Sequence, residues 1–252
     1  MPAQKPPPAK KAVRGQGGSA VKLARWAKPV DAATRREVFA RFRQANPEPK
    51  GELEHTNPYT LLVAVVLSAQ STDAGVNKAT RELFRVADTP QKMLALGEDG
   101  VREHIRTINF LNTKARNVTK LSRVLVEEHG GKVPGSVEVL ETLPGVGRKS
   151  ASVVANMAFG IPRIAVDTHI FRVSNRIPLV VAPTPLETQE KLEALVEDEF
   201  RLHAHHWLIL HGRYVCKARK PECWRCLIAD LCRYQPKTPS PAQGSSLTPP
   251  RV

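Results

Sequence analysis

The sequence predicts an all-α protein, and two observations support this class. Apolar residues recur at helical spacing through the body of the chain, for example at Ala115, Val118, Leu121 and Leu125. No segment alternates apolar and polar residues between hairpin turns, as a half-buried strand would. With 252 residues, 41% of them hydrophobic, the chain can bury a core without disulfides. We therefore expect helices joined by short connections.

Start and stop signals place six of these helices. The expected segments are 59–69, 89–97, 115–129, 136–142, 148–159 and 184–200. The first is apolar nearly all round, which is typical of a buried central helix. The segments that start at Thr89 and Thr184 each have a capping residue followed by proline, and Thr184 to Glu187 also has the pattern of a capping box. Glycine ends the helices at residues 97, 130 and 160.

The net charge of +14 comes from 38 Lys+Arg and 24 Asp+Glu, and such an excess is typical of proteins with a polyanionic partner. Residues 1–30 hold seven basic residues and no acid, and residues 235–252 hold two basic residues, no acid and five prolines. Neither segment can bury enough apolar surface to offset its chain entropy, so both are expected to be disordered. Only +5 then remains on residues 31–234. The N-terminal tail could be a DNA-contacting arm, a transit-like presequence or a solvated extension.

The lengths of the apolar segments exclude a membrane protein and a secreted protein. The longest apolar run, Leu61–Leu67, has seven residues, whereas a spanning helix needs about 20. No apolar region follows the first residues as in a secretory signal. We expect a cytoplasmic protein.

The segment Leu143–Gly147, with the sequence Leu-Pro-Gly-Val-Gly, predicts a helix–hairpin–helix motif that binds DNA. Gly145 and Gly147 allow the backbone to approach another molecule, and Val146 lies between them. The helix that starts at Arg148 then points its first N–H groups outward, where the helix dipole favours a phosphate. Such a contact does not depend on base sequence.

Two residues near this hairpin could carry chemistry. Lys149 falls in the first turn of a helix, where the dipole disfavours a cation and favours the neutral amine that Schiff-base chemistry needs. Spacing alone does not decide between a nucleophile and a phosphate-contacting lysine. Asp167 precedes an expected helix, and on sequence alone it is a capping residue.

The four cysteines, Cys216, Cys223, Cys226 and Cys232, predict a metal or cluster site in a reducing compartment, because they are clustered rather than spread along the chain. Four thiolates suit either zinc or a [4Fe–4S] cluster. Only one pair is close, whereas structural zinc sites usually have two such pairs, so the spacing favours the iron–sulfur cluster. The first interval carries Lys217, Arg219 and Lys220, which could contact phosphates in a loop closed at both ends.

The histidines at positions 203, 205, 206 and 211 resemble a metal site at first sight. They share a helix with Trp207 and Leu208, and no Asp or Glu ligand joins them. Packing and hydrogen bonding account for them better than a metal does.

Taken together, these motifs closely resemble the endonuclease III family of DNA glycosylase/AP lyases. The resemblance covers about residues 31–234. It rests on Leu67–Asp73, Leu143–Lys149, Val166–Val173, His205–Tyr214 and the four cysteines. The hairpin alone occurs in many DNA-binding proteins, but its combination with Lys149, Asp167 and this cysteine spacing is specific.

The resemblance implies two helical domains with a DNA cleft between them. A six-helix barrel with the helix–hairpin–helix would occupy residues 51–161, and a cluster domain would combine residues 31–50 with 162–234. Lys149 and Asp167 would be catalytic, the cysteines would hold [4Fe–4S], and Gln70 would fill the space left by an extruded nucleotide. The function implied is removal of oxidised pyrimidines from duplex DNA, by a monomer, with nicking 3′ to the abasic site through a lysine Schiff base.

One loop departs from the family pattern. The family's Ile-Gly-Leu-Tyr-Asn-Ser-Lys is Ile-Asn-Phe-Leu-Asn-Thr-Lys here, at residues 108–114. Asn109, Phe110 and Leu111 would face DNA, and Phe110 replaces an aliphatic wedge with a ring that can stack on bases. We expect an altered opposite-base preference or lesion range.

Two alternatives share some of these features. A monofunctional adenine glycosylase has the hairpin, the aspartate and the cluster, but it lacks the lysine and carries an added C-terminal domain. This chain has Lys149 and ends 20 residues after Cys232. A non-catalytic DNA-binding or redox-sensing module would have no need of both Lys149 and Asp167.

Overall fold

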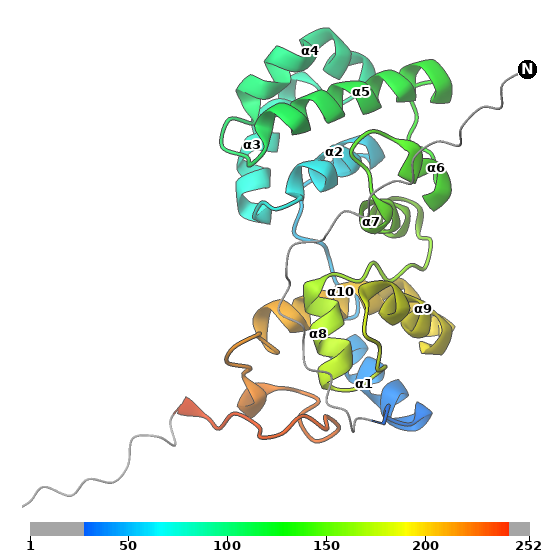
Figure 1. Cartoon of the computed structure of the whole chain (residues 1–252), viewed down its shortest axis with the longest axis vertical. Coiled ribbons are helices and arrows are strands. Elements are labelled where there is room, and N and C mark those ends of the chain that lie inside the picture. The colour runs from blue at the N-terminus through cyan, green and yellow to red at the C-terminus, as the bar shows by residue number, and fades with distance from the viewer. Residues whose placement is uncertain (1–27, 242–252) are drawn as a thin grey trace, which may run out of the picture.

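The structure, a computed structural model, describes residues 28–241 (Figure 1). In this part of the chain it contains ten α-helices, one short 3₁₀ helix at Cys223–Arg225 and no strand, so the predicted all-α class is confirmed. The α-helices are α1 Ala32–Ala45, α2 Pro58–Ser68, α3 Asp73–Val86, α4 Pro90–His104, α5 Leu111–His129, α6 Val137–Thr142, α7 Arg148–Phe159, α8 Thr168–Arg176, α9 Pro185–Leu195 and α10 Asp198–Tyr214. No helix of residues 28–241 is long and apolar enough to cross a bilayer.

Most of the two predicted tails, residues 1–27 and 242–252, lies outside the described residues. The described ends of these tails contact the body of the protein. Val30 is buried and its backbone N–H donates a hydrogen bond to the carbonyl of Pro178. Lys237 Nζ donates one to the carbonyl of Cys232 at 2.9 Å.

Two apolar clusters organise the helices. The first is built from the six helices α2 to α7, and the second from α1, α8, α9 and α10 with the segment after them. Figure 1 shows the first group in the upper half of the molecule and the second in the lower half. The chain passes from the first to the second through the residues between Gly160 and Asp167.

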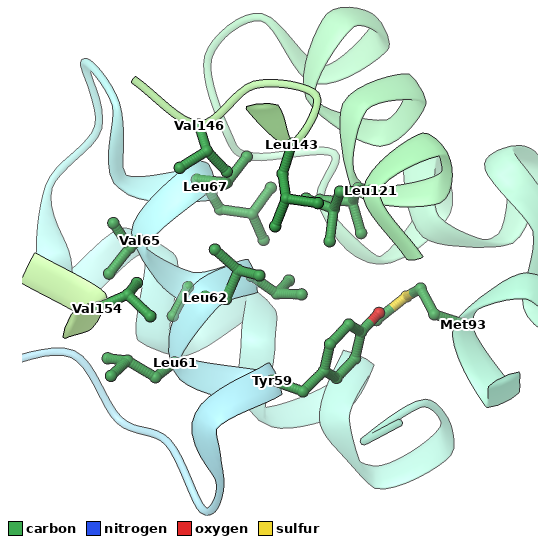
Figure 2. Packing of buried hydrophobic residues seen from close by; sticks show 14 of the residues in the cluster. Tyr59, Leu61, Leu62, Val65, Leu67, Met93, Leu121, Leu143, Val146 and Val154 are labelled. Carbon is green, nitrogen blue, oxygen red and sulfur yellow. The ribbon is translucent and has the colours of Figure 1, made fainter. Parts of the chain in front are cut away.

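Helix α2 lies at the centre of the first cluster. Its cap, Asn57, accepts a hydrogen bond from the N–H of Thr60, and the Thr60 hydroxyl accepts one in return from the N–H of Asn57. Every residue from Tyr59 to Leu67 is buried, as the apolar run predicts. Figure 2 shows these side chains surrounded by residues from four other parts of the barrel, including Met93, Leu121, Leu143 and Val154.

One predicted helix end is confirmed and another is wrong. Gly97 has the non-helical angles φ +75° and ψ 170°, so the helix that begins after Thr89 stops there as predicted, and a second helical segment follows it to His104 within α4. The helix that begins after Thr184 ends at Leu195 rather than near Phe200. Val196 becomes extended and is buried, and α10 begins at Asp198, so that Phe200 also reaches the second core. A propensity argument cannot detect such a break, because the packing of Val196 decides it.

Candidate functional site

The hairpin between α6 and α7 is fixed against the barrel. Gly145 has φ +81°, and a Cβ built there would lie 2.7 Å from Nδ2 of Asn117, so only glycine fits. The Val146 side chain is buried, and Figure 2 shows it beside Leu67 of α2. Its N–H already donates to the carbonyl of Leu143. Val146 therefore shapes the turn, and its side chain is not placed to contact DNA.

The N-terminus of α7 is left open. Gly147 caps it without a side-chain hydrogen bond, and a Cβ at this position would meet no atom within 4 Å. The first N–H groups of a helix have no partner inside the helix. Arg148 and Lys149 follow directly and are both exposed. This end of α7 can therefore accept an anion from solvent.

Lys149 also lines a cavity of about 80 Å³ between the two apolar clusters. One wall comes from the first half of the molecule, including Leu53, Ser68 and Val153, and the other from α10. On α10, Arg213 forms ion pairs with Glu52 and Asp73, which line the same cavity. The amine-bearing residue thus lies where the two halves meet, beside a charged network that holds them together.

Asp167 caps α8, as the sequence predicts. Its Oδ1 atom accepts hydrogen bonds from the N–H groups of His169 and Ile170, both at 2.9 Å. Its Oδ2 atom accepts none from the described residues. Asp167 is partly exposed and is not among the residues that line the Lys149 cavity. One oxygen is therefore used for the cap, and the other is available for chemistry.

The loop residues predicted to face DNA gather at one place on the barrel. Gln70 follows α2, and Asn109 and Phe110 precede α5, of which Leu111 is the first residue. Asn109 Nδ2 donates a hydrogen bond to the Gln70 carbonyl at 2.8 Å. Gln70 and Asn109 line one groove, and the Phe110 side chain is 63% exposed. The structure thus brings these two loops together, although Gln70 and Phe110 are 40 positions apart in the sequence.

The four cysteines are free thiols and line one cavity beside the second apolar cluster. Arg176 Nη1 lies 3.6 Å from the Sγ of Cys216, and burial raises the pKa of the Cys226 thiol to about 11. Among the described residues, no three His, Cys, Asp or Glu side chains are close enough to share a single metal ion. A Cys₄ set around one cavity, with a guanidinium beside it, fits an anionic iron–sulfur cluster.

The basic residues of the first cysteine interval differ in their surroundings. Lys217 Nζ is paired with Glu222 at 2.6 Å, whereas Arg219 and Lys220 are exposed and have no ion pair among residues 28–241. Arg219 and Lys220 are the members of this loop that are free to contact a phosphate.

Three of the four histidines of α10 are buried. His205, His206 and His211 are at most 7% exposed, and His205 and His206 line the Lys149 cavity. Burial, with a smaller effect of the neighbouring His206, lowers the pKa of His205 to about 3. Burial, with a smaller effect of His203, lowers the pKa of His206 to about 4. Both rings are therefore neutral at neutral pH.

These two histidines predict a loss of stability in mild acid. The unfolded chain binds a proton at each ring below about pH 6.5, whereas the folded chain does not, so the stabilisation is complete above that pH and falls as the pH decreases. Between about pH 7 and pH 5 we expect each ring to cost about 2 kcal/mol of unfolding free energy. Urea unfolding at the two pH values measures this. The variant His206→Gln should lose less stability over the interval, and an equal loss in both proteins would contradict the assignment.

Comparisons with known proteins bear directly on this geometry. Residues 63–198 match the HhH-GPD superfamily of base excision DNA repair proteins, and residues 216–232 match the iron-sulfur binding domain of endonuclease III. Endonuclease III of Haemophilus influenzae is 55% identical over 201 residues, which cover 80% of this chain and 95% of that protein. The chain belongs to the endonuclease III family.

Further relatives agree with this assignment. Endonuclease III of Escherichia coli strain K12 is 53% identical over 82% of this chain and 99% of its own length. A solved structure described as a trapped endonuclease III–DNA covalent intermediate superposes with a TM-score of 0.75 at 41% identity, over 81% of this chain and 96% of that one. A non-covalent endonuclease III–DNA complex superposes equally well.

Membership in the endonuclease III family identifies the class of enzyme and its cofactor. The protein is a DNA-binding enzyme of base excision repair, a DNA glycosylase/AP lyase, and it holds a [4Fe–4S] cluster. The cluster prediction is confirmed and the zinc alternative is excluded. The matched residues 216–232 include all four cysteines.

Sequence reasoning missed several residues of the cavity. Glu52, Asp73 and Arg213 meet there, although they are up to 161 positions apart in the chain. Asp73 and Arg213 belong to segments that carry the family resemblance, which was the only available signal. Glu52 had no signal, because nothing in its local pattern indicates an ion pair with α10.

Proposed function

We propose that this enzyme removes oxidised pyrimidines of the thymine glycol type from duplex DNA and cleaves the strand 3′ to the resulting abasic site. The observation that carries the proposal is the position of Lys149. Its amine-bearing side chain stands in the first turn of α7, directly after the hairpin, and lines the cavity between the two halves of the molecule. A lysine that served only phosphate binding would have no reason to line this cavity.

The chemistry begins with extrusion of the damaged nucleotide, because C1′ of its sugar cannot be reached inside the stacked duplex. Lys149 Nζ attacks C1′, the glycosidic bond breaks, and the base leaves with the electron pair and takes up a proton. The free Oδ2 of Asp167 stabilises the positive charge that develops on the sugar and assists the proton transfers. Ring opening gives a Schiff base on Lys149. Loss of a C2′ proton then expels the 3′ phosphate and nicks the strand.

Two surfaces would hold the DNA backbone while the base is out. The open N-terminus of α7, with Gly145, Gly147 and Arg148, would bind phosphates on one side of the lesion. Arg219 and Lys220 would bind phosphates further along the duplex. We assign the chain as a monomer that acts on duplex DNA with oxidised pyrimidines or abasic sites in the bacterial cytoplasm, where its DNA substrate lies.

Cys216, Cys223, Cys226 and Cys232 would hold the [4Fe–4S] cluster. Held by these four thiolates, the cluster would fix the basic loop that carries Arg219 and Lys220, and base excision would need no electron from it. Arg176 donates hydrogen bonds to the carbonyls of Lys217 and Ala218 in that loop, at 2.8 and 3.1 Å, and so supports the same arrangement.

Borohydride trapping on a thymine glycol duplex tests the proposed function. The Schiff base is reduced to a stable amine, so we expect a covalent protein–DNA adduct from the wild type and, without borohydride, a nick 3′ to the lesion. A duplex without damage is the control. Neither adduct nor nick from the cluster-loaded protein would refute the proposal.

Phe110 predicts a change in the choice of opposite base. Phe110 is 63% exposed in the loop that precedes α5, and its ring can stack on bases where an aliphatic side chain cannot. We expect Phe110→Leu to alter the relative rates on thymine glycol opposite adenine and opposite guanine, with a ratio that changes by about fivefold, since base–aromatic stacking is worth about 1–3 kcal/mol. Single-turnover kinetics on the two duplexes measure the ratio. An unchanged ratio would show that the ring does not contact the opposite strand.

A further inference from the structure

Two residues have an unusual backbone conformation, one in the loop after α2 and one in the loop before α5. Among residues 28–241, Gln70 and Phe110 are the only non-glycine residues with positive φ, at 56° and 59°. Left-handed backbone is unfavourable for residues with a Cβ, and it persists where the surroundings enforce it. Since Asn109 Nδ2 donates to the Gln70 carbonyl, the two residues lie on loops that touch each other.

A buried lysine sits behind both loops. Lys114 is 6% exposed and has no salt bridge to a carboxylate among residues 28–241. Its ammonium group donates three hydrogen bonds, to the carbonyls of Leu67 and Ala69 at 2.8 and 2.7 Å and to Oγ of Ser71 at 3.0 Å. The three acceptors flank Gln70 on both sides, and they lie at the C-terminal end of α2.

The C-terminal end of α2 favours the positive charge of Lys114, whereas burial disfavours it. The last carbonyls of a helix have no partner within it, and the helix dipole favours positive charge there. Burial nevertheless lowers the pKa of Lys114, so the interior opposes its charge. A core that needed only packing would place an apolar side chain here, because Lys114 occupies the same helix face as Val118 and Leu121, which are fully buried.

Lys114 also connects directly to the second loop. It is the fourth residue of α5, and its backbone N–H donates to the carbonyl of Phe110 at 3.0 Å. One residue therefore holds the Gln70 loop with its side chain and the Phe110 loop with its backbone. Movement of either loop relative to the other would break these bonds.

We propose that Lys114 is a positioning residue that fixes the Gln70 and Phe110 loops as one rigid two-pronged unit, so that both side chains enter the duplex together when the damaged nucleotide leaves. This inference rests on the proposed function. Rigid placement matters because a shift of about 1 Å in a positioning element can reduce a rate by about a hundredfold. Lys114 itself does not touch the reacting atoms.

Lys114→Met tests this role, since methionine fills a similar volume without charge or donors. Lys120→Met on the same helix is the matched control, because Lys120 is exposed. We expect Lys114→Met to slow single-turnover cleavage of an abasic site in duplex DNA by about tenfold to a hundredfold. Cleavage of an abasic site in single-stranded DNA should stay unchanged, because no opposite strand or stacked duplex has to be held open there.

A spectroscopic measurement separates positioning from a general loss of structure. With 2-aminopurine opposite a tetrahydrofuran abasic analogue, insertion of the two prongs should unstack the probe and raise its fluorescence. We expect the rise with the wild type and Lys120→Met, and a much smaller rise with Lys114→Met at saturating protein. Asn109→Ala removes the hydrogen bond from Asn109 to the Gln70 carbonyl and leaves Lys114 in place. We expect it to reduce the fluorescence rise less than Lys114→Met does.

Different results would overturn the proposed function and the positioning role of Lys114. If the wild type neither cleaves abasic DNA nor forms the borohydride adduct, the proposed function fails. If the wild type is active and Lys114→Met matches it on duplex DNA and in fluorescence, the positioning role is overturned. Equal losses on duplex and single-stranded substrates would also overturn it, because they would show that Lys114 only maintains the fold.

Discussion

Asp167→Asn should lose base removal from thymine glycol duplexes by about a hundredfold or more while the protein keeps its fold. Asparagine caps a helix as well as aspartate does, and the capping atom Oδ1 is retained. The change replaces the free Oδ2 with an amide and removes the negative charge. Single-turnover excision, with thermal unfolding beside it, measures both effects.

The same variant should cleave a preformed abasic site with a smaller loss, because no base leaves and less positive charge develops on the sugar. Asp31→Asn is the matched control: Asp31 caps α1 through a 2.7 Å hydrogen bond from Thr34 and lies outside the cavity. If Asp167→Asn excised thymine glycol as fast as Asp31→Asn, Asp167 would be a cap and nothing more.

Cys226→Ala should release the cluster and destabilise the second half of the molecule. Cys216, Cys226 and Cys232 pack against the second apolar cluster, and the segment around them has only the short 3₁₀ helix Cys223–Arg225 as regular structure. Metal binding is therefore a large part of the folding free energy there. We expect loss of the visible absorbance and iron content, and a melting temperature lower by about 10 °C or more.

Leu227→Ser is the control for this variant, because Leu227 is the exposed neighbour of Cys226. It should keep the iron and the melting temperature. A Cys226→Ala protein with full iron content would show that Cys226 is not a ligand.

Local signals predicted those parts of the molecule that local physics controls. The caps at Thr89, Ser136 and Asp167 begin α4, α6 and α8 as expected, because each side chain accepts a hydrogen bond from its own first turn. The break after Leu195 was not predictable from propensity, since the burial of Val196 and Phe200 in the second core decides it.

In the candidate site, too, some residues can be predicted from the sequence and others depend on tertiary packing. Lys149 and the cysteines were predicted from spacing and from the family resemblance. The network of Arg213 with Glu52 and Asp73 depends on how distant segments pack, which spacing does not contain. The sequence does carry a signal for Lys114: it is a lysine at an apolar register, one turn before Val118, and such a residue needs buried acceptors.

The role of Lys149 as the nucleophile can be tested at the covalent bond itself. The borohydride adduct formed with thymine glycol DNA can be digested with protease and nuclease, and the peptide that carries the sugar remnant identified by mass spectrometry. We expect the remnant on Lys149, and no adduct from a folded, iron-loaded Lys149→Ala protein. An adduct on another lysine of the wild type, or undiminished trapping by Lys149→Ala, would contradict it.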